Sequence, residues 1–343
     1  MTDQGLRLGI DFGGTKTEII GLDARNGKEL YRKRIPTRRD DYDQTLHSFV
    51  SLVEEAEASL DMKGTVGMGI PGTVSTDTNR IKNSNSVWMN DKPLQKDLSG
   101  LLGREVRIQN DANCFAVSEA IDGAGKGAKI VFGVIIGTGC GGGISIDGKP
   151  VSGINGIGGE WGHNPLPSLK FSGKESAAWL EYFDHELGGN METAQIYKHK
   201  DPIEYITDDP SWNEYPGPAC YCGKRGCLER WISGTGFKND YARVTGEVLS
   251  THDIVAKAQE GDKKCVAALD RYADRLARAL AQIINILDPD VIVLGGGMSN
   301  VERLYEDVPK IWDRYVFSDS CKTSLRPPRH GDSSGVRGAA WLW

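Results

Sequence analysis

The chain has 343 residues, enough for about two average domains, and its 41 Lys and Arg against 47 Asp and Glu give a net charge of −6. This acidic balance argues against a nucleic-acid-binding protein, which would present a basic face. The 43 glycines cluster between apolar runs, which indicates places where the backbone comes close to a ligand.

The sequence shows no export or membrane signal. Its first residues lack the basic and apolar segments of a signal peptide. The longest uncharged run, 130–146, contains six glycines and is too short to span a membrane. We therefore expect a cytoplasmic protein without membrane contact. In that reducing compartment, closely spaced cysteines are expected to bind a metal before they form disulfides.

Strands and helices alternate in the first 120 residues. Short apolar runs predict strands at 6–10, 17–22, 28–35, 65–70 and 105–108. Apolar residues at helical spacing predict a helix within 41–60, and a second short helix is predicted at 112–121. The glycine-rich tip 11–16 separates the first two strands, so a second strand rather than a helix follows the glycines.

The same order of strand, glycine turn and strand recurs after the glycine-rich segment 123–127. Predicted strands at 130–136 and 144–147 flank the loop 137–143, and the second ends at the turn pair Asp147-Gly148. A long helix at 264–287 and a buried strand at 291–294 follow. The repetition predicts two α/β halves of similar construction.

The two glycine tips suggest phosphate binding. Residues 137–142 fit the G-x-G-x-x-G pattern of dinucleotide-binding folds, but that pattern requires a helix directly after the glycines, and here a strand follows. Backbone N–H groups at such tips can bind anions. Asp11 could hold Mg²⁺ through water, and Lys16 could neutralise a phosphate. The alternative is that both tips are only tight turns.

Asp111 lies between a predicted strand and a predicted helix. An Asp at this place often caps the helix, but Cys114 stands where a capping box would have Glu or Gln. A carboxylate at a strand end also suits a general base for a hydroxyl group. Both interpretations stay open from the residues alone.

Three cysteines, Cys220, Cys222 and Cys227, lie within eight residues around two glycines. Glycine lets the chain fold back so that the three sulfur atoms point at one centre. A tetrahedral zinc site needs a fourth ligand, and three cysteines with one histidine form a common structural set. The alternative is that the cysteines are incidental free thiols.

The segments 11–16, 137–143 and 295–297 resemble the phosphate-1, phosphate-2 and adenosine segments of the actin/hexokinase/Hsp70 ATPase superfamily. Within it, the chain resembles the ROK family (repressors, open reading frames, kinases) over nearly its whole length, particularly the bacterial fructokinases and mannokinases. The resemblance implies two ribonuclease-H-like α/β domains around a central cleft, with a structural zinc site. The implied domains are 1–120 with a C-terminal helix at about 326–343, and 121–325 with the zinc motif and an insertion at about 170–212.

The resemblance also implies the cofactors ATP, Mg²⁺ and structural Zn²⁺, and a role for each matching residue. Asp111 is the catalytic base and also binds the sugar, together with Asn85, Asn110, Glu160, His163 and Glu229. The zinc ligands are His163, Cys220, Cys222 and Cys227. The nucleotide-binding residues are Gly9, Ile10, Asp11, Phe12, Gly13, Gly14, Thr15, Lys16, Gly137, Thr138, Gly139, Cys140, Gly141, Gly142, Gly143, Ile144, Gly295, Gly296 and Gly297.

We therefore expect an ATP-dependent hexose kinase that phosphorylates the 6-hydroxyl of fructose, and of mannose, and that forms a homodimer. A glucokinase or an N-acetylhexosamine kinase of the same family is the alternative. A sugar-responsive ROK repressor would carry a DNA-binding segment ahead of the first motif, where the sequence has ten residues. An actin-like or chaperone-like ATPase would give no reason for the zinc motif.

Overall fold

The computed structural model describes residues 5–167 and 209–343, which divide into two compact units. Unit 1 comprises Met1–Gly162, Ile286–Tyr305 and Lys322–Trp343, and unit 2 comprises His163–Asn285 and Glu306–Cys321. The domain boundary predicted after residue 120 falls inside unit 1 and stays a prediction. The insertion predicted at about 170–212 lies outside the described residues except for 209–212.

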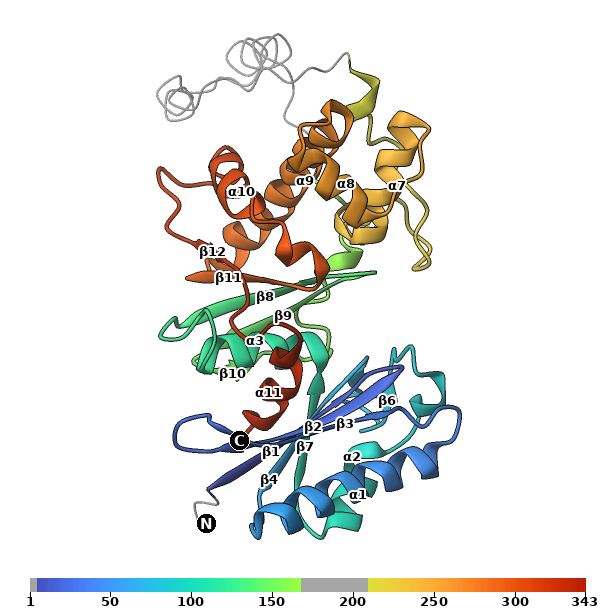
Figure 1. Ribbon diagram of the computed structural model, residues 1–343, viewed down its shortest axis with the longest axis vertical. Helices are drawn as coiled ribbons and strands as arrows, with labels where there is room; N and C mark the ends of the chain where they lie inside the picture. Colours follow the sequence, from blue (N-terminus) through green and yellow to red (C-terminus); the bar gives the residue numbers. More distant parts are fainter. Residues whose placement is uncertain (1–4, 168–208) are drawn as a thin grey trace. The chain divides into compact units, whose positions relative to one another are not determined.

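The first sheet of unit 1 has the strand order β3-β2-β1-β4-β7 (Figure 1). β1 pairs antiparallel with β2, β2 pairs antiparallel with β3, and β1, β4 and β7 run parallel. All five strands were predicted. β1, β2 and β4 are mostly buried apolar runs, whereas β3 is an edge strand with exposed and half-buried residues. Their bounds are β1 Leu6–Phe12, β2 Lys16–Asp23, β3 Glu29–Pro36, β4 Thr65–Ile70 and β7 Val106–Asn110.

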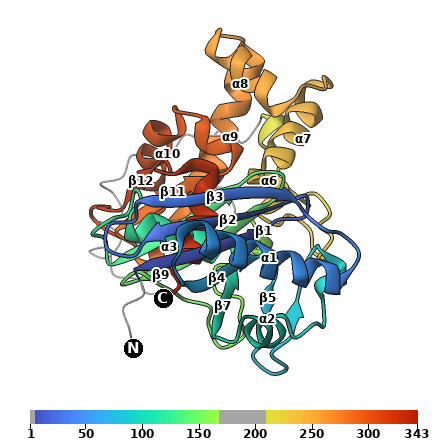
Figure 2. The ribbon, with the colours of Figure 1, turned by 60° about the horizontal axis from the view of Figure 1, so that its bottom comes forward.

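Helices cover both faces of this sheet. α1 (Tyr42–Leu60) contacts β2 and β3, α2 (Leu94–Leu102) contacts β7, and Figure 2 shows α1 lying along the sheet. α11 (Ser334–Ala340) packs on the other face, against β1, β2 and β4. Successive β1 residues divide between the faces: Ile10 joins the core that includes Phe49 of α1, whereas a Cβ at Gly9 would overlap the backbone of α11.

The second sheet of unit 1 repeats this order as β10-β9-β8-β11-β12. β8 is antiparallel to β9, which is antiparallel to β10, and β8, β11 and β12 run parallel. Two mixed five-stranded sheets of matching order confirm the predicted α/β fold class. The bounds are β8 Ile130–Ile136, β9 Cys140–Ile146, β10 Lys149–Pro150, β11 Val291–Gly295 and β12 Ser324–Arg326.

The predicted loop 137–143 is wrong in its second half, because β9 already begins at Cys140. Gly143 pairs with Gly133 of β8, and α3 (Asp111–Ile121) packs directly on this pair. A Cβ at Gly143 would overlap the carbonyl oxygen of Ala112 in α3. These glycines therefore allow a helix to approach a sheet. The predicted turn Asp147-Gly148 is present, with φ of 51° and 73°.

The described part of unit 2 is largely helical. It contains α6 (Glu229–Ile232), α7 (Gly234–Thr245), α8 (Thr251–Gln259) and most of α9 (Lys263–Leu287) and α10 (Leu304–Trp312). Among the described residues, no helix has the length and apolar character needed to cross a membrane.

The short elements of the two units are β5 Thr73–Val74, β6 Ile81–Lys82, and the 3₁₀ turns Val87–Met89, Trp161–His163, Pro210–Trp212, Gly297–Asn300 and Gly331–Ser333.

Candidate active site and metal centre

Asp111 and Asn110 stand where β7 ends and α3 begins. The Asn110 side chain accepts a hydrogen bond from the Ala112 N–H at 2.9 Å, and its amide donates to the Gly72 carbonyl at 3.0 Å. Asn110 is therefore the N-cap of α3, and Asp111 is the first helical residue. The capping role that the sequence left open for Asp111 belongs to its neighbour. The Asp111 carboxylate also accepts from the Ala112 N–H, at 2.8 Å.

Two carboxylates of this region have pKa values close to neutral. Burial raises the pKa of Asp111 to about 6, and the negative charge of Glu160 acts in the same direction. Burial, with the charges of Asp111 and Glu18, raises the pKa of Asp11 to about 7. Carboxyl groups whose pKa values are raised by burial and by a neighbouring negative charge are typical of functional sites. The structure thus brings Asp11, Asp111 and Glu160 into one electrostatic cluster.

Glu160 follows a turn that is anchored to β9. The Trp161 indole N–H donates to the Gly141 carbonyl at 3.0 Å, and its buried ring meets Phe132 edge-to-face at 5.6 Å between centroids. The Glu160 N–H donates to the Ile157 carbonyl at 3.1 Å. Trp161 therefore anchors the segment that carries the exposed Glu160, whose negative charge helps to raise the pKa of Asp111. Its hydrogen bond to β9 was not predicted from the sequence.

The three glycine segments differ in which residues remain open. At Gly14, Gly137 and Gly297, no atom from beyond the neighbouring backbone lies within 4 Å of the Cβ position, so a side chain there would meet open space. The predicted nucleotide contacts Gly9, Gly142, Gly143, Gly295 and Gly296 instead have protein atoms at that position.

The other predicted nucleotide-binding residues also divide into buried and exposed ones. The side chains of Ile10, Phe12 and Cys140 are buried, which leaves them only backbone atoms to offer a ligand. Lys16 is exposed beside the first tip, and its carbonyl accepts from the Gly13 N–H at 2.9 Å.

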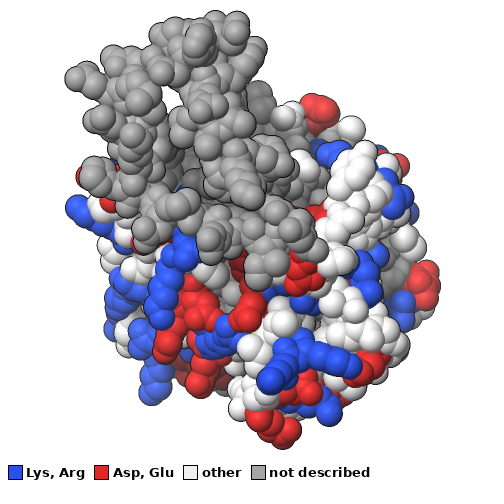
Figure 3. Space-filling view, turned by 90° about the horizontal axis from the view of Figure 1, so that it is seen from above, with Lys and Arg blue, Asp and Glu red and all other residues white. Residues whose placement is uncertain are grey.

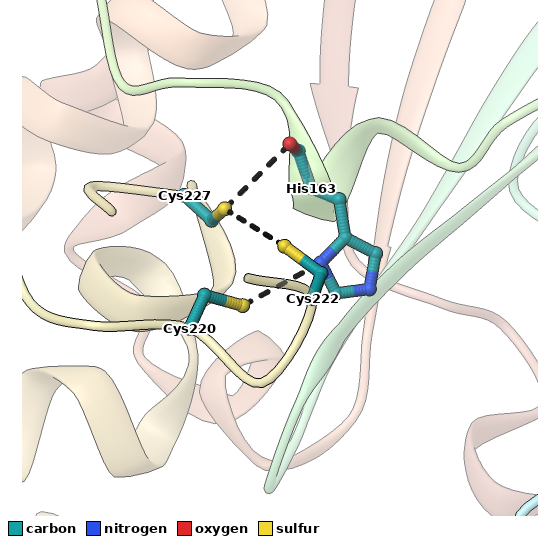
Figure 4. A group of neighbouring side chains, drawn as sticks. All are labelled: His163, Cys220, Cys222 and Cys227. Carbon is teal, nitrogen blue, oxygen red and sulfur yellow. Dashed lines mark hydrogen bonds between the residues drawn. The ribbon is translucent and has the colours of Figure 1, made fainter. Parts of the chain in front are cut away.

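His163, Cys220, Cys222 and Cys227 converge on one point (Figure 4). Their ligand atoms all lie within 4.8 Å of one another, with 3.7 Å between His163 Nδ1 and Cys220 Sγ and 3.6 Å between the sulfurs of Cys222 and Cys227. Zinc bonds of about 2.3 Å to sulfur and 2.0–2.1 Å to nitrogen place tetrahedral ligands roughly 3.5–3.8 Å apart. The cluster therefore fits Zn²⁺, as predicted.

Backbone contacts hold this cluster in shape. A β-bridge joins Pro165 to Cys227, and the Cys220 N–H donates to the Lys224 carbonyl at 2.9 Å. The backbone hydrogen bond at Lys224 lowers the pKa of Cys222, which favours the thiolate that a metal binds. His163 Nε2 lies 3.0 Å from the Tyr221 hydroxyl, a partner that the cysteine spacing does not reveal.

The two remaining predicted sugar ligands belong to two different elements. Asn85 is exposed in the loop after β6, and Glu229 is the half-buried first residue of α6, two positions after Cys227. On the described surface in Figure 3, Lys and Arg lie beside Asp and Glu, so charges of both signs are mixed there.

The model of the ROK family matches residues 7–343. The N-acetyl-D-glucosamine kinase of Yersinia pseudotuberculosis is 38% identical over 334 residues, 97% of each chain. That of Mannheimia succiniciproducens is 38% identical over 335 residues, 98% of each chain. The solved ROK hexokinase of Thermus thermophilus superimposes with a TM-score of 0.76 at 27% identity, over 98% of this chain and 97% of that one.

These findings confirm the resemblance to ROK sugar kinases and correct one part of it. The relatives with 38% identity are N-acetyl-D-glucosamine kinases and not the fructokinases or mannokinases that the resemblance suggested. They favour the alternative that the sequence left open, a kinase of an N-acetylated hexose. The match over residues 7–343 shows that the chain belongs to the ROK family.

Proposed function

We propose that this ROK-family protein is an ATP-dependent kinase of N-acetyl-D-glucosamine that phosphorylates the sugar at its 6-hydroxyl. The observation that carries the proposal is the 38% identity to N-acetyl-D-glucosamine kinases over 97% of both chains. The cluster of Asp11, Asp111 and Glu160 supports it, because phosphoryl transfer to a hydroxyl needs a base beside a site of charge neutralisation.

Asp111 is the proposed general base. With a pKa of about 6 its carboxylate is ionised at neutral pH and yet basic enough to take the proton of the 6-hydroxyl as that oxygen attacks. Bound ATP and Mg²⁺ supply the phosphoryl group and its charge neutralisation. The open backbone at Gly14, Gly137 and Gly297 would approach the nucleotide, and Lys16 and Asp11 would face its phosphates and metal.

Sugar recognition is proposed for Asn85, Asn110, Asp111, Glu160, His163 and Glu229. Both ends of the Asn110 side chain are already bonded, to Ala112 and Gly72, so Asn110 also keeps Asp111 in place. The zinc site would hold the imidazole of His163 in one orientation through Nδ1. We also propose a homodimer, which light scattering on the purified protein tests directly.

The test is a comparison of acceptors. Purified protein is assayed for ATP consumption with N-acetyl-D-glucosamine, glucose, fructose and mannose, and the product is assigned by phosphorus NMR. We expect the highest kcat/KM with N-acetyl-D-glucosamine and a 6-phosphate product. A higher kcat/KM with fructose, or no sugar-dependent consumption of ATP, would contradict the proposal.

A further inference from the structure

Three arginines of α9 are buried inside unit 2. Arg271, Arg275 and Arg278 follow one another at spacings of four and three residues, so they share one face of the helix. The side chains of Arg275 and Arg278 are 1% and 0% exposed. Arginine is almost never buried to this degree unless its guanidinium group is paired. The groups that pair with these arginines therefore indicate which parts of the chain α9 holds in place.

Arg278 joins two segments that are far apart in the sequence. Its guanidinium group donates to both carboxylate oxygens of Glu214, at 2.7 and 3.0 Å, and also to the Pro167 carbonyl. Pro167 stands four residues after His163 of the metal cluster. Glu214 stands six residues before Cys220 of the same cluster. One buried side chain thus connects the two segments that supply these ligands.

Arg275 and Tyr272 attach a third segment to the same helix. Arg275 Nε donates to Glu214 at 2.7 Å, and its guanidinium carbon lies 4.4 Å from the ring centroid of Trp231. The Tyr272 hydroxyl donates to the Ile232 carbonyl at 2.8 Å. Trp231 and Ile232 belong to α6, which begins two residues after the last cysteine of the cluster. α9 therefore contacts each of the three segments that carry a ligand of the cluster.

These contacts involve backbone carbonyls, Glu214 and Trp231, and not the side chains of the metal ligands. They can therefore hold the segments in place before a metal binds, which lowers the cost of ordering the ligands. We propose that Arg275 and Arg278, paired with Glu214, are positioning residues that hold the three ligand segments together and thereby strengthen zinc binding at the cluster. The same contacts would place the sugar ligands His163 and Glu229, a consequence that rests on the proposed function.

Glu214→Gln tests the proposal. Gln keeps the size of the side chain but loses the charge and one of the two acceptor oxygens, so it cannot pair with both arginines as the carboxylate does. We expect the zinc affinity of the purified protein, measured by competition with a chromogenic chelator, to fall by roughly 10–100-fold, as it does for residues that orient metal ligands. The matched control is Glu247→Gln. Glu247 also pairs with α9, through Lys264 at 2.6 Å, but its side chain is 51% exposed, and zinc affinity should stay as in the wild type.

Arg278→Lys tests the other side of the pair. Lys keeps the positive charge but lacks the planar fork that reaches Glu214 and Pro167 together, so zinc affinity should fall here as well. A residue that only stabilised unit 2 would lower the melting temperature and leave zinc affinity unchanged. In both variants, KM for the sugar should rise and excess zinc should restore it, while KM for ATP stays as in the wild type.

The outcomes separate the inference from the proposed function. Weaker zinc binding in Glu214→Gln and Arg278→Lys, with wild-type binding in Glu247→Gln, supports the positioning role. A folded Glu214→Gln variant with wild-type zinc affinity overturns it, whatever its melting temperature, and this variant decides alone if Arg278→Lys does not fold. An equal loss of zinc affinity in Glu247→Gln also overturns it. A wild type that binds zinc but does not phosphorylate N-acetyl-D-glucosamine overturns the proposed function and leaves the comparison of zinc affinities valid.

Discussion

At the scale of single residues, the backbone and the surroundings of Asp111 shift its pKa in opposite directions. The Ala112 N–H donates to its carboxylate, which favours the ionised form, while burial and Glu160 favour the neutral form and prevail. The result is a base with a pKa of about 6 in place of the ordinary 3.8. A carboxyl group with a raised pKa is a better base but lowers the stability of the fold, because its charge is less favourable in the folded protein than in the unfolded chain.

Asp111→Asn should therefore lower activity and raise stability. Asn keeps an oxygen for the Ala112 N–H but cannot take a proton, so we expect turnover to fall by roughly 10²–10⁴-fold with ATP binding retained. Because the folded-state pKa is raised, the ionised carboxylate destabilises the fold fully above pH 6, and this cost fades as the pH falls toward 3.8. The melting temperature of the variant should exceed that of the wild type at pH 8, with a smaller difference at pH 5.

Asp91→Asn provides the matched control, because the Asp91 side chain is 87% exposed. It should change neither turnover nor the dependence of the melting temperature on pH. An Asp111→Asn variant with wild-type turnover would show that Asp111 only begins the helix.

The pH dependence of activity follows from the same group. Asp111 must be ionised to act as the base, so kcat/KM should decline as the pH falls through about 6. Asp11, with a pKa of about 7, interacts with Asp111, so the profile will report apparent values of the pair. Measurement between pH 5 and 9 at constant ionic strength checks this, and a profile that stays flat down to pH 5 speaks against Asp111 as the base.

At the scale of elements, some glycines allow a helix to pack closely on a sheet, whereas others have no such packing role. α3 lies on β8 and β9 because Gly133 and Gly143 leave no side chain between the helix and the sheet. α11 approaches β1 and β4 through Gly9 and Gly67 in the same manner. Gly14 has no such neighbour, so close packing of a helix does not explain why a glycine stands there.

Gly143→Ala and Gly14→Ala should therefore differ in effect. The added methyl at position 143 pushes against the Ala112 backbone beside Asp111, so we expect a loss of about 1–3 kcal/mol in unfolding free energy, typical of overpacking, together with reduced turnover. The methyl at position 14 meets no protein atom, so stability should be unchanged while KM for ATP rises. Equal melting temperatures for the two variants would contradict this division.

The zinc loop allows a second prediction at this scale. The purified protein should contain about one zinc per chain, and Cys222→Ser should lose the metal and unfold at lower temperature, because metal binding contributes to folding. Cys321→Ser is the control, since Cys321 lies outside the cluster and should leave the zinc content unchanged. Metal analysis by mass spectrometry decides, and a wild type without metal but with full stability would refute the site.

The sequence patterns predicted the bounds of the strands better than they predicted the contacts between side chains. Buried strands such as β4 and β8 are apolar runs with sharp ends, so their bounds match the structure. α2 was missed because it is short, and α7 because its first turn contains two glycines. The metal ligands were predictable from residue type and spacing. The contacts of Trp161 and Tyr221 depend on how distant segments fold together, which local patterns do not encode.

At the scale of the whole molecule, unit 2 adds a group of buried ion pairs to its apolar packing. Unit 1 has apolar cores between its sheets and helices. Unit 2 places charged groups in its interior, where Arg271 and Arg275 of α9 pair with Asp240 of α7. These side chains are almost fully buried, and losing one partner would leave a buried charge uncompensated. Unit 2 therefore combines apolar packing, in which Phe237, Tyr272 and Leu276 are fully buried, with ion pairs that must stay complete.

Loss of the metal should then loosen one unit and spare the other. The zinc ligands all belong to unit 2, and the Leu228 N–H, next to Cys227, donates to Asn164 at 2.8 Å, so the cluster holds the segments around 163–167 and 218–232 together. In hydrogen-exchange mass spectrometry, the Cys222→Ser variant, or the wild type treated with a strong chelator, should exchange faster in those segments, while β1 and β4 stay protected by the core of unit 1. Faster exchange in β1 and β4 to the same extent would mean that the zinc site stabilises the whole chain and not unit 2 alone.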